Sequence, residues 1–536
     1  MEVSRRALIG GMAGTGGAAL LGGPALAAPA GVRAGGASPP LGPVVIGKDD
    51  PRYGYLTTRG ANGRFTGRPD SVRLVGSPDQ VVQVVGEAMR GGGRVAVRSG
   101  GHCFENFVDD PAVRVVIDTS EMNAVYFDPR YQAFAVETGA TLGEIYRTLY
   151  LGWGVTIPGG ACPSVGAGGH IAGGGYGALS RSHGVVADHL YGVDIVVVDR
   201  SGNPRRVVAT RDSTGPERDL WWAHTGGGGG NFGIVTRYLL RSPQARGRNP
   251  ADLLPKPPRT YRYCSITWQW DDMNEADFSR LVRNFGAWHE KDAAGPSPYD
   301  GLGGGITLSH RESGQPIMVW VHLDEAVPDA DRLLRRYAEA VTKDVGAAHQ
   351  SGFGSQQWID SALYQGSSWG RVEFKTKAAL QRKAWTDAQI GAVHRFLTEG
   401  GGTRWGTLVS LSLFGGKINT VPSAATAMAH RDALFMALYD TAWVDAAERD
   451  PQLAMMRRLY KEMYAGTGGV PAPGPVNSGA YINYPDVDLA DPEWNTSGVP
   501  WHALYYRDNY RRLQQVKAHW DPRDAFRHAL AIRPSN

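Results

Sequence analysis

The sequence predicts an α+β protein built from two main domains and a C-terminal segment that returns to the first. Short β-branched strand patterns mix with helical patterns over residues 45–245, as expected for one α+β domain. Residues 241–258 are rich in Pro and Arg and indicate a domain boundary. Tryptophan-containing strands and amphipathic helices then predict an antiparallel sheet with flanking helices over residues 246–474, before a final segment at 475–536.

The first domain opens with a strand and a capped helix. Residues 72–74 form a short strand, and Ser77 begins a helix that runs to Met89. The Ser77 hydroxyl can accept from free N–H groups of the first turn, and Pro78 fits the first helical position. By the same patterns we expect strands at 94–98, 113–117, 134–136, 194–198 and 234–240, and a helix at 142–149.

The second domain alternates strands with longer helices. Residues 265–270 and 318–323 have the apolar and aromatic character of strands. Residues 329–342 and 386–397 place apolar side chains at helical spacing, which predicts amphipathic helices packed on the sheet.

The composition fits an ordinary globular protein and excludes one class of partner. Of the 536 residues, 42% are hydrophobic and 20% are charged, which is enough apolar material for a large core. The formal net charge is only +4 and no dense Lys/Arg face accompanies it, so we expect no nucleic-acid partner. Cys103, Cys162 and Cys264 do not form a disulfide framework, and we assign no metal site.

Two glycine-rich segments are the most informative feature of the chain. The first, residues 98–106, contains His102, and the second, residues 159–177, contains Cys162, 60 residues later. Glycine is costly to order and is kept where a backbone adopts positive φ or approaches a ligand closely. Two such clusters, each with one nucleophilic side chain, indicate a wrapped cofactor, which we interpret as a flavin bound at two points.

A family resemblance supports this interpretation. The two segments resemble the flavin attachment sites of the berberine bridge enzyme-like family, within the vanillyl-alcohol oxidase fold. The resemblance implies a PCMH-type FAD-binding domain and an antiparallel-sheet substrate domain. It also implies covalent FAD, with an 8α-histidyl bond at His102 and a 6-S-cysteinyl bond at Cys162; a structural histidine is the alternative. Further similar segments lie at 219–236, 374–380, 479–489 and 501–532.

Other residues of these segments are expected to bind the cofactor. Backbone N–H groups of Gly100 and Gly101 would face the FAD pyrophosphate, with Arg98 and Ser99 as additional donors; a simple tight turn is the alternative. The glycine run at 226–230 would make a second close approach, unless it is a flexible loop. The remaining expected cofactor-binding residues are Val165, Gly166, Gly169, His170, Gly173, Gly228, Asn231, Phe232, Gly233, Ile234, Val235 and Asn509.

Two of these residues have a more specific expected role. By resemblance His170 lies near the flavin N1/C2 edge or the ribityl chain, where a donor or a positive charge stabilises the anionic reduced flavin. A buried structural histidine is the alternative. Val165 occupies a position associated in the family with oxygen access, and plain core packing is its alternative.

Tyr484 is the expected catalytic base, with Tyr176 as its partner. Removing a hydroxyl proton while hydride leaves the same carbon requires a base, and a phenol serves only if neighbours lower its pKa from about 10. Packing tyrosines on a strand are the alternative. Lys375 and Lys377 would supply positive potential, unless they are solvated. Family members often carry Tyr where this chain has Phe414, which removes a proton-transferring group.

The N-terminus resembles a twin-arginine export signal. Arg5 and Arg6 precede an uncharged Gly/Ala/Leu stretch, with residues 25–27 as a small-residue cleavage candidate. A membrane anchor is disfavoured because the stretch is poor in Leu, Ile and Phe. We therefore expect a signal peptide at 1–28, a linker at 29–44, the twin-arginine machinery as partner, and a secreted protein without a membrane span in its mature form.

Together these expectations describe a secreted FAD-dependent oxidase. It would remove hydride from an alcohol or hemiacetal carbon of a sugar or glycosylated natural product and pass the electrons to dioxygen, releasing hydrogen peroxide. One alternative is a tailoring oxidase that dehydrogenates or cyclises a secondary-metabolite scaffold. Another is a flavin-bearing binding protein without turnover. The tryptophans that would suit sugar or polyketide rings are Trp268, Trp270, Trp320 and Trp405.

Overall fold

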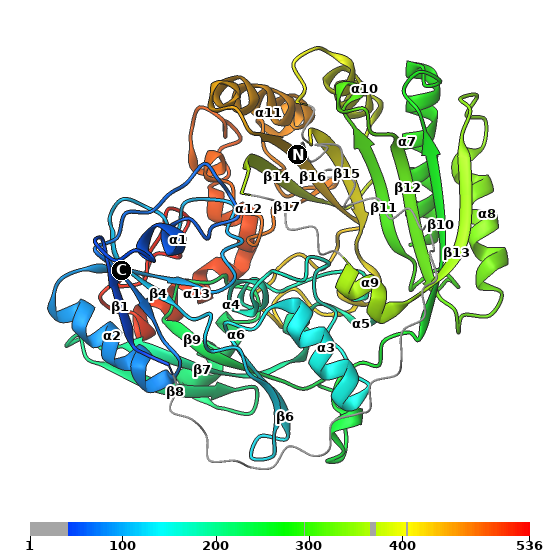
Figure 1. Cartoon of the computed structure of the whole chain (residues 1–536). Coiled ribbons are helices and arrows are strands. Elements are labelled where there is room, and N and C mark those ends of the chain that lie inside the picture. Colours follow the sequence, from blue (N-terminus) through cyan, green and yellow to red (C-terminus); the bar gives the residue numbers. More distant parts are fainter. Residues whose placement is uncertain (1–40, 294, 365–370, 404–405, 536) are drawn as a thin grey trace.

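Three sheets and their covering helices make up the fold (Figure 1). The fold class is α+β, as the sequence predicts. The predicted signal peptide at 1–28 and most of the predicted linker at 29–44 lie outside the described residues. This computed structural model describes residues 41–293, 295–364, 371–403 and 406–535.

The first sheet runs in the order β1-β2-β4-β3, with β1 antiparallel to β2 and the other neighbours parallel. Helix α2 (Pro78–Arg90) begins as predicted, because the Ser77 side chain accepts from the Gln80 N–H. Valines of α2 pack against this sheet and the next one. The strands are β1 (Val44–Gly47), β2 (Ser71–Leu74), β3 (Arg94–Arg98) and β4 (Val113–Asp118), and α1 (Tyr53–Thr57) precedes β2.

The second sheet is antiparallel throughout and has the order β5-β6-β9-β7-β8. Its strands are β5 (Val125–Asp128), β6 (Ala133–Glu137), β7 (Leu190–Val198), β8 (Pro204–Thr210) and β9 (Ile234–Leu240). A capping box of Thr141 and Glu144 starts α3, where the sequence places a helix. The helices are α3 (Leu142–Trp153), α4 (Ala167–Ala172), α5 (Ser180–His183) and α6 (Gly215–Ala223).

An eight-stranded antiparallel sheet forms the second half of the molecule, in the order β13-β10-β12-β11-β15-β16-β14-β17. Helices pack on it, among them α8 on β10 and β12 and α11 on β14 and β16 (Figure 1). The strands are β10 (Thr260–Trp268), β11 (Gly303–Ser309), β12 (Ile317–Asp324), β13 (Gln350–Gln357), β14 (Glu373–Gln381), β15 (Leu408–Leu413), β16 (Phe435–Trp443) and β17 (Asn477–Gly479). The helices are α7 (Glu275–Asp292), α8 (Ala330–Thr342), α9 (Trp358–Tyr364), α10 (Asp387–Thr398) and α11 (Arg449–Met463).

The two faces of this sheet differ in solvent exposure. Residues that point toward the helices, such as Val319 and Val321, are fully buried. On the opposite face, Trp320, Ser410 and Ser412 stay partly exposed. The alternation follows from the period of two along each strand.

This alternation corrects part of the tryptophan interpretation. Trp268 and Trp270 are core residues, so neither is available to a bound ring. Trp320 lies on the partly exposed face, and Trp405 lies outside the described residues.

The C-terminal segment connects the two halves. β17 pairs with β14 at the edge of the large sheet, and the chain then continues into α12 (Trp501–Tyr506) and α13 (Tyr510–Trp520). α13 packs against α6, and the Tyr506 hydroxyl donates to the Gly227 carbonyl. These contacts bring residues 480–489, which carry Tyr484 and are called the base loop below, beside the glycine-rich segments of the first half.

Candidate active site

The two glycine-rich segments meet backbone to backbone. A Cβ on Gly100 would overlap the Gly166 N atom, and a Cβ on Gly166 would overlap both Gly100 N and Ser99 Oγ. Glycine is therefore required at both positions so that the loop after β3 can touch the start of α4. This close approach brings together His102 and Cys162, which are far apart in sequence.

His102 and Cys162 contact the same hydroxyl group. His102 Nε2 lies 3.0 Å from Ser164 Oγ, and Cys162 Sγ lies 3.3 Å from it. Burial lowers the pKa of His102, so its imidazole is neutral near pH 7 and keeps a free lone pair. Burial raises the pKa of the neighbouring Cys103 to about 12, so that thiol stays protonated. Ser164 is a contact that the sequence analysis did not single out, although it lies inside the second glycine-rich segment.

The loop after β3 has unpaired backbone N–H groups that could bind an anion. Among the described residues, the N–H groups of Gly100 and Gly101 have no acceptor in the protein. Gly101 has φ of +79°, and its carbonyl accepts from the Ala61 N–H. Neighbouring free N–H groups in such a turn suit a phosphate oxygen.

The side chains of Arg98 and Ser99 donate hydrogen bonds to other protein groups, which differs from their expected donation to the pyrophosphate. The buried Arg98 guanidinium donates to the Leu56 carbonyl at 2.5 Å and to Asp109 at 2.6 Å. Ser99 Oγ donates to the Thr138 carbonyl. Both side chains therefore hold the loop in place rather than present free donors to a ligand.

Open space lies between two other glycines. A Cβ on Gly169 would meet nothing within 4 Å, and one on Gly229 would meet only the Gly169 Cα, at 3.9 Å. Both glycines are exposed; Gly169 lies in α4 and Gly229 lies in the glycine run at 226–230. Gly228, with φ of +86°, donates its N–H to the Ala172 carbonyl and so fixes the second loop against α4. The open side of Gly169 lies on the same short helix as Gly166, so this part of the two glycine-rich segments leaves room for a cofactor.

Several expected cofactor-binding residues hold the glycine run at 226–230 in place. The Asn231 amide donates to three carbonyls of the glycine run, and its oxygen accepts from the Ile532 N–H. A Cβ on Gly233 would overlap the Val196 carbonyl. Phe232 and Ile234 are buried, and Val235 packs beside the core.

Asn509 and Gly173 also have clear local partners. The Asn509 amide donates to the carbonyls of Ser423, Thr426 and Ala427, so its donor group serves the fold. A Cβ on Gly173 would overlap Asn483 Oδ1, which means that Gly173 makes room for the loop that carries Tyr484.

His170 is a neutral histidine in this structure. Burial lowers its pKa to about 4, and its Nε2 accepts from the Gly160 N–H at 3.2 Å. Of the two expected forms, a donor or a positive charge, the lowered pKa favours the neutral donor, with the proton on Nδ1. Val165 is partly buried against the core, and its N–H donates to the Cys162 carbonyl.

Tyr176 and Tyr484 form a hydrogen-bonded pair. Their phenol oxygens are 3.0 Å apart, and the ring planes are nearly perpendicular, at 87°. Phe104 stacks on Tyr484 with ring centroids 5.4 Å apart, and Phe414 packs its ring edge to face with Tyr176. Tyr484 lies in a turn, where its N–H donates to the Tyr481 carbonyl, and not on a strand as the alternative interpretation assumed.

Burial controls the acidity of this pair. It raises the pKa of Tyr484 to about 12, while the Tyr176 hydrogen bond lowers it and the Asp440 charge raises it. The pKa of Tyr176 lies well above its ordinary value, again because of burial. The protein side chains therefore do not give the net lowering that we expected, but Tyr484 is the member that ionises first.

Asp440 is a site residue that the sequence analysis missed. It lies on β16, on the same face as Leu438, and hydrogen-bonds to Thr376 Oγ1 at 2.5 Å. Burial raises its pKa to about 6. A single aspartate in an apolar strand carries no motif, so only the strand register reveals that it faces the tyrosines.

Lys375 and Lys377 are neither solvated nor free. Each side chain is 2% exposed and pairs with buried carboxylates. Their charges are therefore neutralised locally, and the expected positive potential toward the site is not supported.

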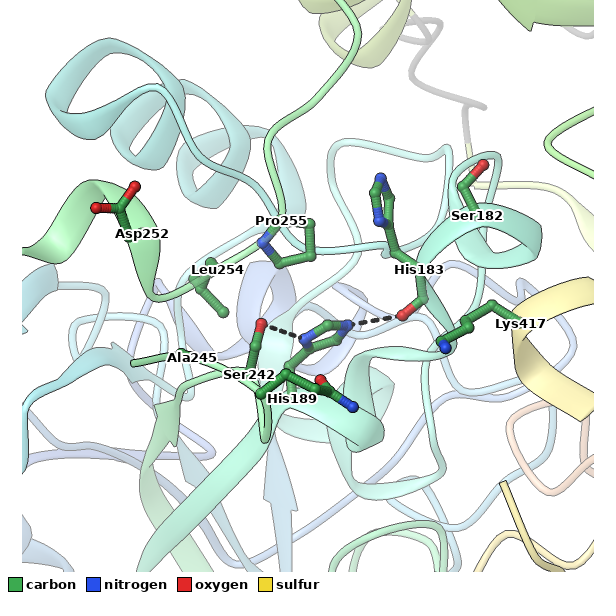
Figure 2. Close-up of a pocket in the computed structure, with 10 residues that line it drawn as sticks. Ser182, His183, His189, Ser242, Ala245, Asp252, Leu254, Pro255 and Lys417 are labelled. Carbon is green, nitrogen blue, oxygen red and sulfur yellow. Dashed lines mark hydrogen bonds between the residues drawn. The ribbon is translucent and has the colours of Figure 1, made fainter. Parts of the chain in front are cut away.

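A separate pocket is lined by residues that include Ser182, His189 and Lys417 (Figure 2). Both ring nitrogens of its His189 have protein partners, the Ser242 hydroxyl at 2.8 Å and the His183 carbonyl at 3.0 Å. The residues that line the pocket include none of the expected site residues, and we assign it no catalytic role.

Comparison with known proteins identifies the family. One family model, described as an FAD binding domain, matches residues 69–206, and another, described as berberine and berberine like, matches residues 480–533. Aclacinomycin-N/aclacinomycin-A oxidase of Streptomyces galilaeus is 50% identical to the chain over 99% of both proteins. The chain belongs to the berberine bridge enzyme-like family. The hexose oxidase of Chondrus crispus is 30% identical over 90% of this chain and 94% of its own.

Solved structures of this family share the whole fold. A glycopeptide hexose oxidase in complex with teicoplanin superposes with a TM-score of 0.89 at 51% identity, covering 93% of this chain and 100% of that one. Aclacinomycin oxidoreductase superposes with the same TM-score at 51% identity, over 92% and 99% of the two chains. The predicted combination of a PCMH-type FAD-binding domain with an antiparallel-sheet domain is confirmed, and the protein is an FAD-dependent oxidoreductase.

Two further properties bear on partners. Over the part of the chain that the structure describes, no three His, Cys, Asp or Glu side chains gather closely enough to hold a metal ion. The same residues contain no helix with the length and apolar character needed to cross a membrane.

Proposed function

We propose that the protein oxidises an alcohol or hemiacetal carbon in the sugar of a glycosylated natural product. The observation that carries this proposal is the Tyr176–Tyr484 pair, a potential base with its own hydrogen-bond donor, beside the two glycine-rich loops. The names of the relatives, an aclacinomycin oxidase and a glycopeptide hexose oxidase, support a sugar-bearing substrate. The partly exposed sheet face with Trp320, Ser410 and Ser412 offers the aromatic surface and hydroxyl groups that a sugar ring needs.

The residues divide the reaction between them as follows. When bound, FAD would supply the hydride acceptor and the route of the electrons to dioxygen. Tyr484 accepts the hydroxyl proton, and Tyr176 donates its O–H to the Tyr484 oxygen, which favours the ionised form. Phe104 and Phe414 hold the two rings and keep water from the pair. The His170 Nδ1–H is a neutral donor toward the cofactor.

We also propose that FAD is attached at His102 and Cys162. A neutral imidazole and a thiolate are both nucleophiles that can add to an electron-poor flavin ring. The two side chains share the Ser164 hydroxyl and therefore lie within reach of one ring system. Cys103 is less suited because its thiol is held protonated.

Peroxide release from a substrate panel tests the function. Glycosylated antibiotics and free oligosaccharides should each be compared with the matching aglycone under air. Peroxide from glycosylated compounds but not from their aglycones is the expected result. Peroxide from aglycones alone would favour the dehydrogenation of a natural-product scaffold, and flavin-loaded protein that oxidises nothing in the panel would favour a binding protein.

Export by the twin-arginine machinery is a further proposal, supported by the N-terminal sequence. Arg5→Lys combined with Arg6→Lys keeps the charge but removes the paired arginines that the machinery recognises. The variant should accumulate in the cytoplasm with its flavin bound, as measured by immunoblotting of cell and medium fractions. Unchanged secretion of the variant would require another export route.

A further inference from the structure

Lys375 joins three segments that are distant in sequence. Its ammonium lies 2.7 Å from Glu105, which follows His102 by three residues, and 2.7 Å from Asp486, which follows Tyr484 by two. All three charged side chains are at most 4% exposed. One cation on β14 therefore bridges the base loop and residues 99–105, which carry His102 and are called the attachment loop.

The bridge belongs to a larger buried network. Lys377 lies 2.6 Å from Asp486 and 2.8 Å from Asp488. Arg457 of α11 pairs with Asp488 through two hydrogen bonds. Three cations thus pair with the three carboxylates of Glu105, Asp486 and Asp488, and the Arg64 guanidinium also interacts electrostatically with these carboxylates.

Uncharged contacts also connect the attachment loop with β14 and with Tyr484. Asn62 donates to the carbonyls of Phe104 and Phe374, at 2.8 and 3.1 Å, which ties the attachment loop to β14. Phe104 packs its ring against Phe374 and stacks on Tyr484. Phe104, one of the residues that contact the Tyr484 ring, therefore lies between His102 and Glu105 in the sequence.

A buried ion network is a poor source of stability, because desolvation offsets much of the Coulomb attraction. It does specify geometry, since the ammonium must meet both carboxylates at once or leave a charge unpaired in the interior. We propose that Lys375, through Glu105 and Asp486, is a positioning residue that fixes Tyr484 relative to the flavin attached near His102. This inference rests on the proposed role of Tyr484.

A charge-neutral double variant tests the bridge without leaving a buried charge. Glu105→Leu with Lys375→Met removes one charge of each sign and fills the space with apolar side chains, while Lys377 still pairs with Asp486. We expect a melting temperature near wild type and flavin still retained after denaturation. Amides of residues 480–489 should exchange with deuterium faster, and anaerobic flavin reduction should slow by about 10²-fold, with little change in substrate affinity.

Arg457→Gln is the matched control, because it alters the same network at its outer end and does not touch the attachment loop. Because its partner is Asp488, it should leave the exchange of residues 480–486 and the reduction rate near wild type. Wild-type exchange and reduction rates in the double variant would overturn the positioning role of Lys375. If Tyr484→Phe also reduces its flavin at the wild-type rate, the proposed function of Tyr484 fails instead, whatever the double variant does.

Discussion

Replacing Tyr484 with phenylalanine should slow anaerobic flavin reduction by about 10²–10⁴-fold, the usual contribution of a positioned general base. The substitution keeps the ring and its stacking on Phe104, so substrate binding should change little. Reoxidation of the reduced flavin by dioxygen should stay near wild type, because that half-reaction does not use the phenol. Stopped-flow bleaching of the oxidised flavin band measures both half-reactions. A Tyr484→Phe enzyme that bleaches at the wild-type rate would move the search to Tyr176 and His170.

The pH dependence of the same measurement provides two opposed controls. The rate should rise with pH, because burial holds the pKa of Tyr484 high and a base must be deprotonated. Tyr176→Phe removes the hydrogen bond that lowers this pKa and should move the rising limb to higher pH. Asp440→Asn removes a charge that raises it and should move the limb to lower pH. Tyr481 also contacts the Tyr484 ring and is left unchanged in both variants.

Combining His102→Ala with Cys162→Ala should release essentially all of the flavin when the protein is denatured. In wild type, yellow colour should remain with the precipitate after acid treatment, and proteolysis should give two peptides joined through the flavin. Each single variant should retain one bond, because each side chain reaches the ring from its own loop. Peptide mapping by mass spectrometry distinguishes the four species.

Cys103→Ala is the control for that experiment. Cys103 is adjacent to His102, but burial keeps its thiol protonated, so both bonds should form without it. Free FAD in the supernatant of denatured wild-type protein would exclude covalent attachment. Loss of the cysteinyl bond in Cys103→Ala would mean that the wrong thiol was assigned.

The local elements could be predicted from the sequence because their determinants are local. Ser77 and Pro78 start α2 through a capping hydrogen bond and a fixed φ, both of which depend only on neighbouring residues. β-branched runs predicted β3, β4 and β9 to within one residue, whereas most strands of the large sheet were not predicted. The two attachment segments were recognisable because their glycines and nucleophiles are close together in sequence.

The surroundings of these residues could not be predicted in the same way. Arg98, Asn509 and His170 have side chains suited to a cofactor. Carbonyl groups of distant segments accept from Arg98 and Asn509, however, and burial lowers the pKa of His170. Trp268 and Trp320 belong to the same kind of strand. Trp268 is buried and Trp320 is partly exposed because helices pack on only one face of the sheet.

The sequence alone determined which chemical groups this protein has and which fold class it forms, since composition, capping residues and strand patterns act over short distances. The tertiary structure decided which groups meet. Gly100 touches Gly166, Tyr176 bonds to Tyr484, and Lys375 bridges Glu105 and Asp486 only because folding brings distant segments into contact. Burial then sets the charge state of the titratable groups, because removal from water disfavours an unpaired charge, and a partner of opposite charge offsets that cost.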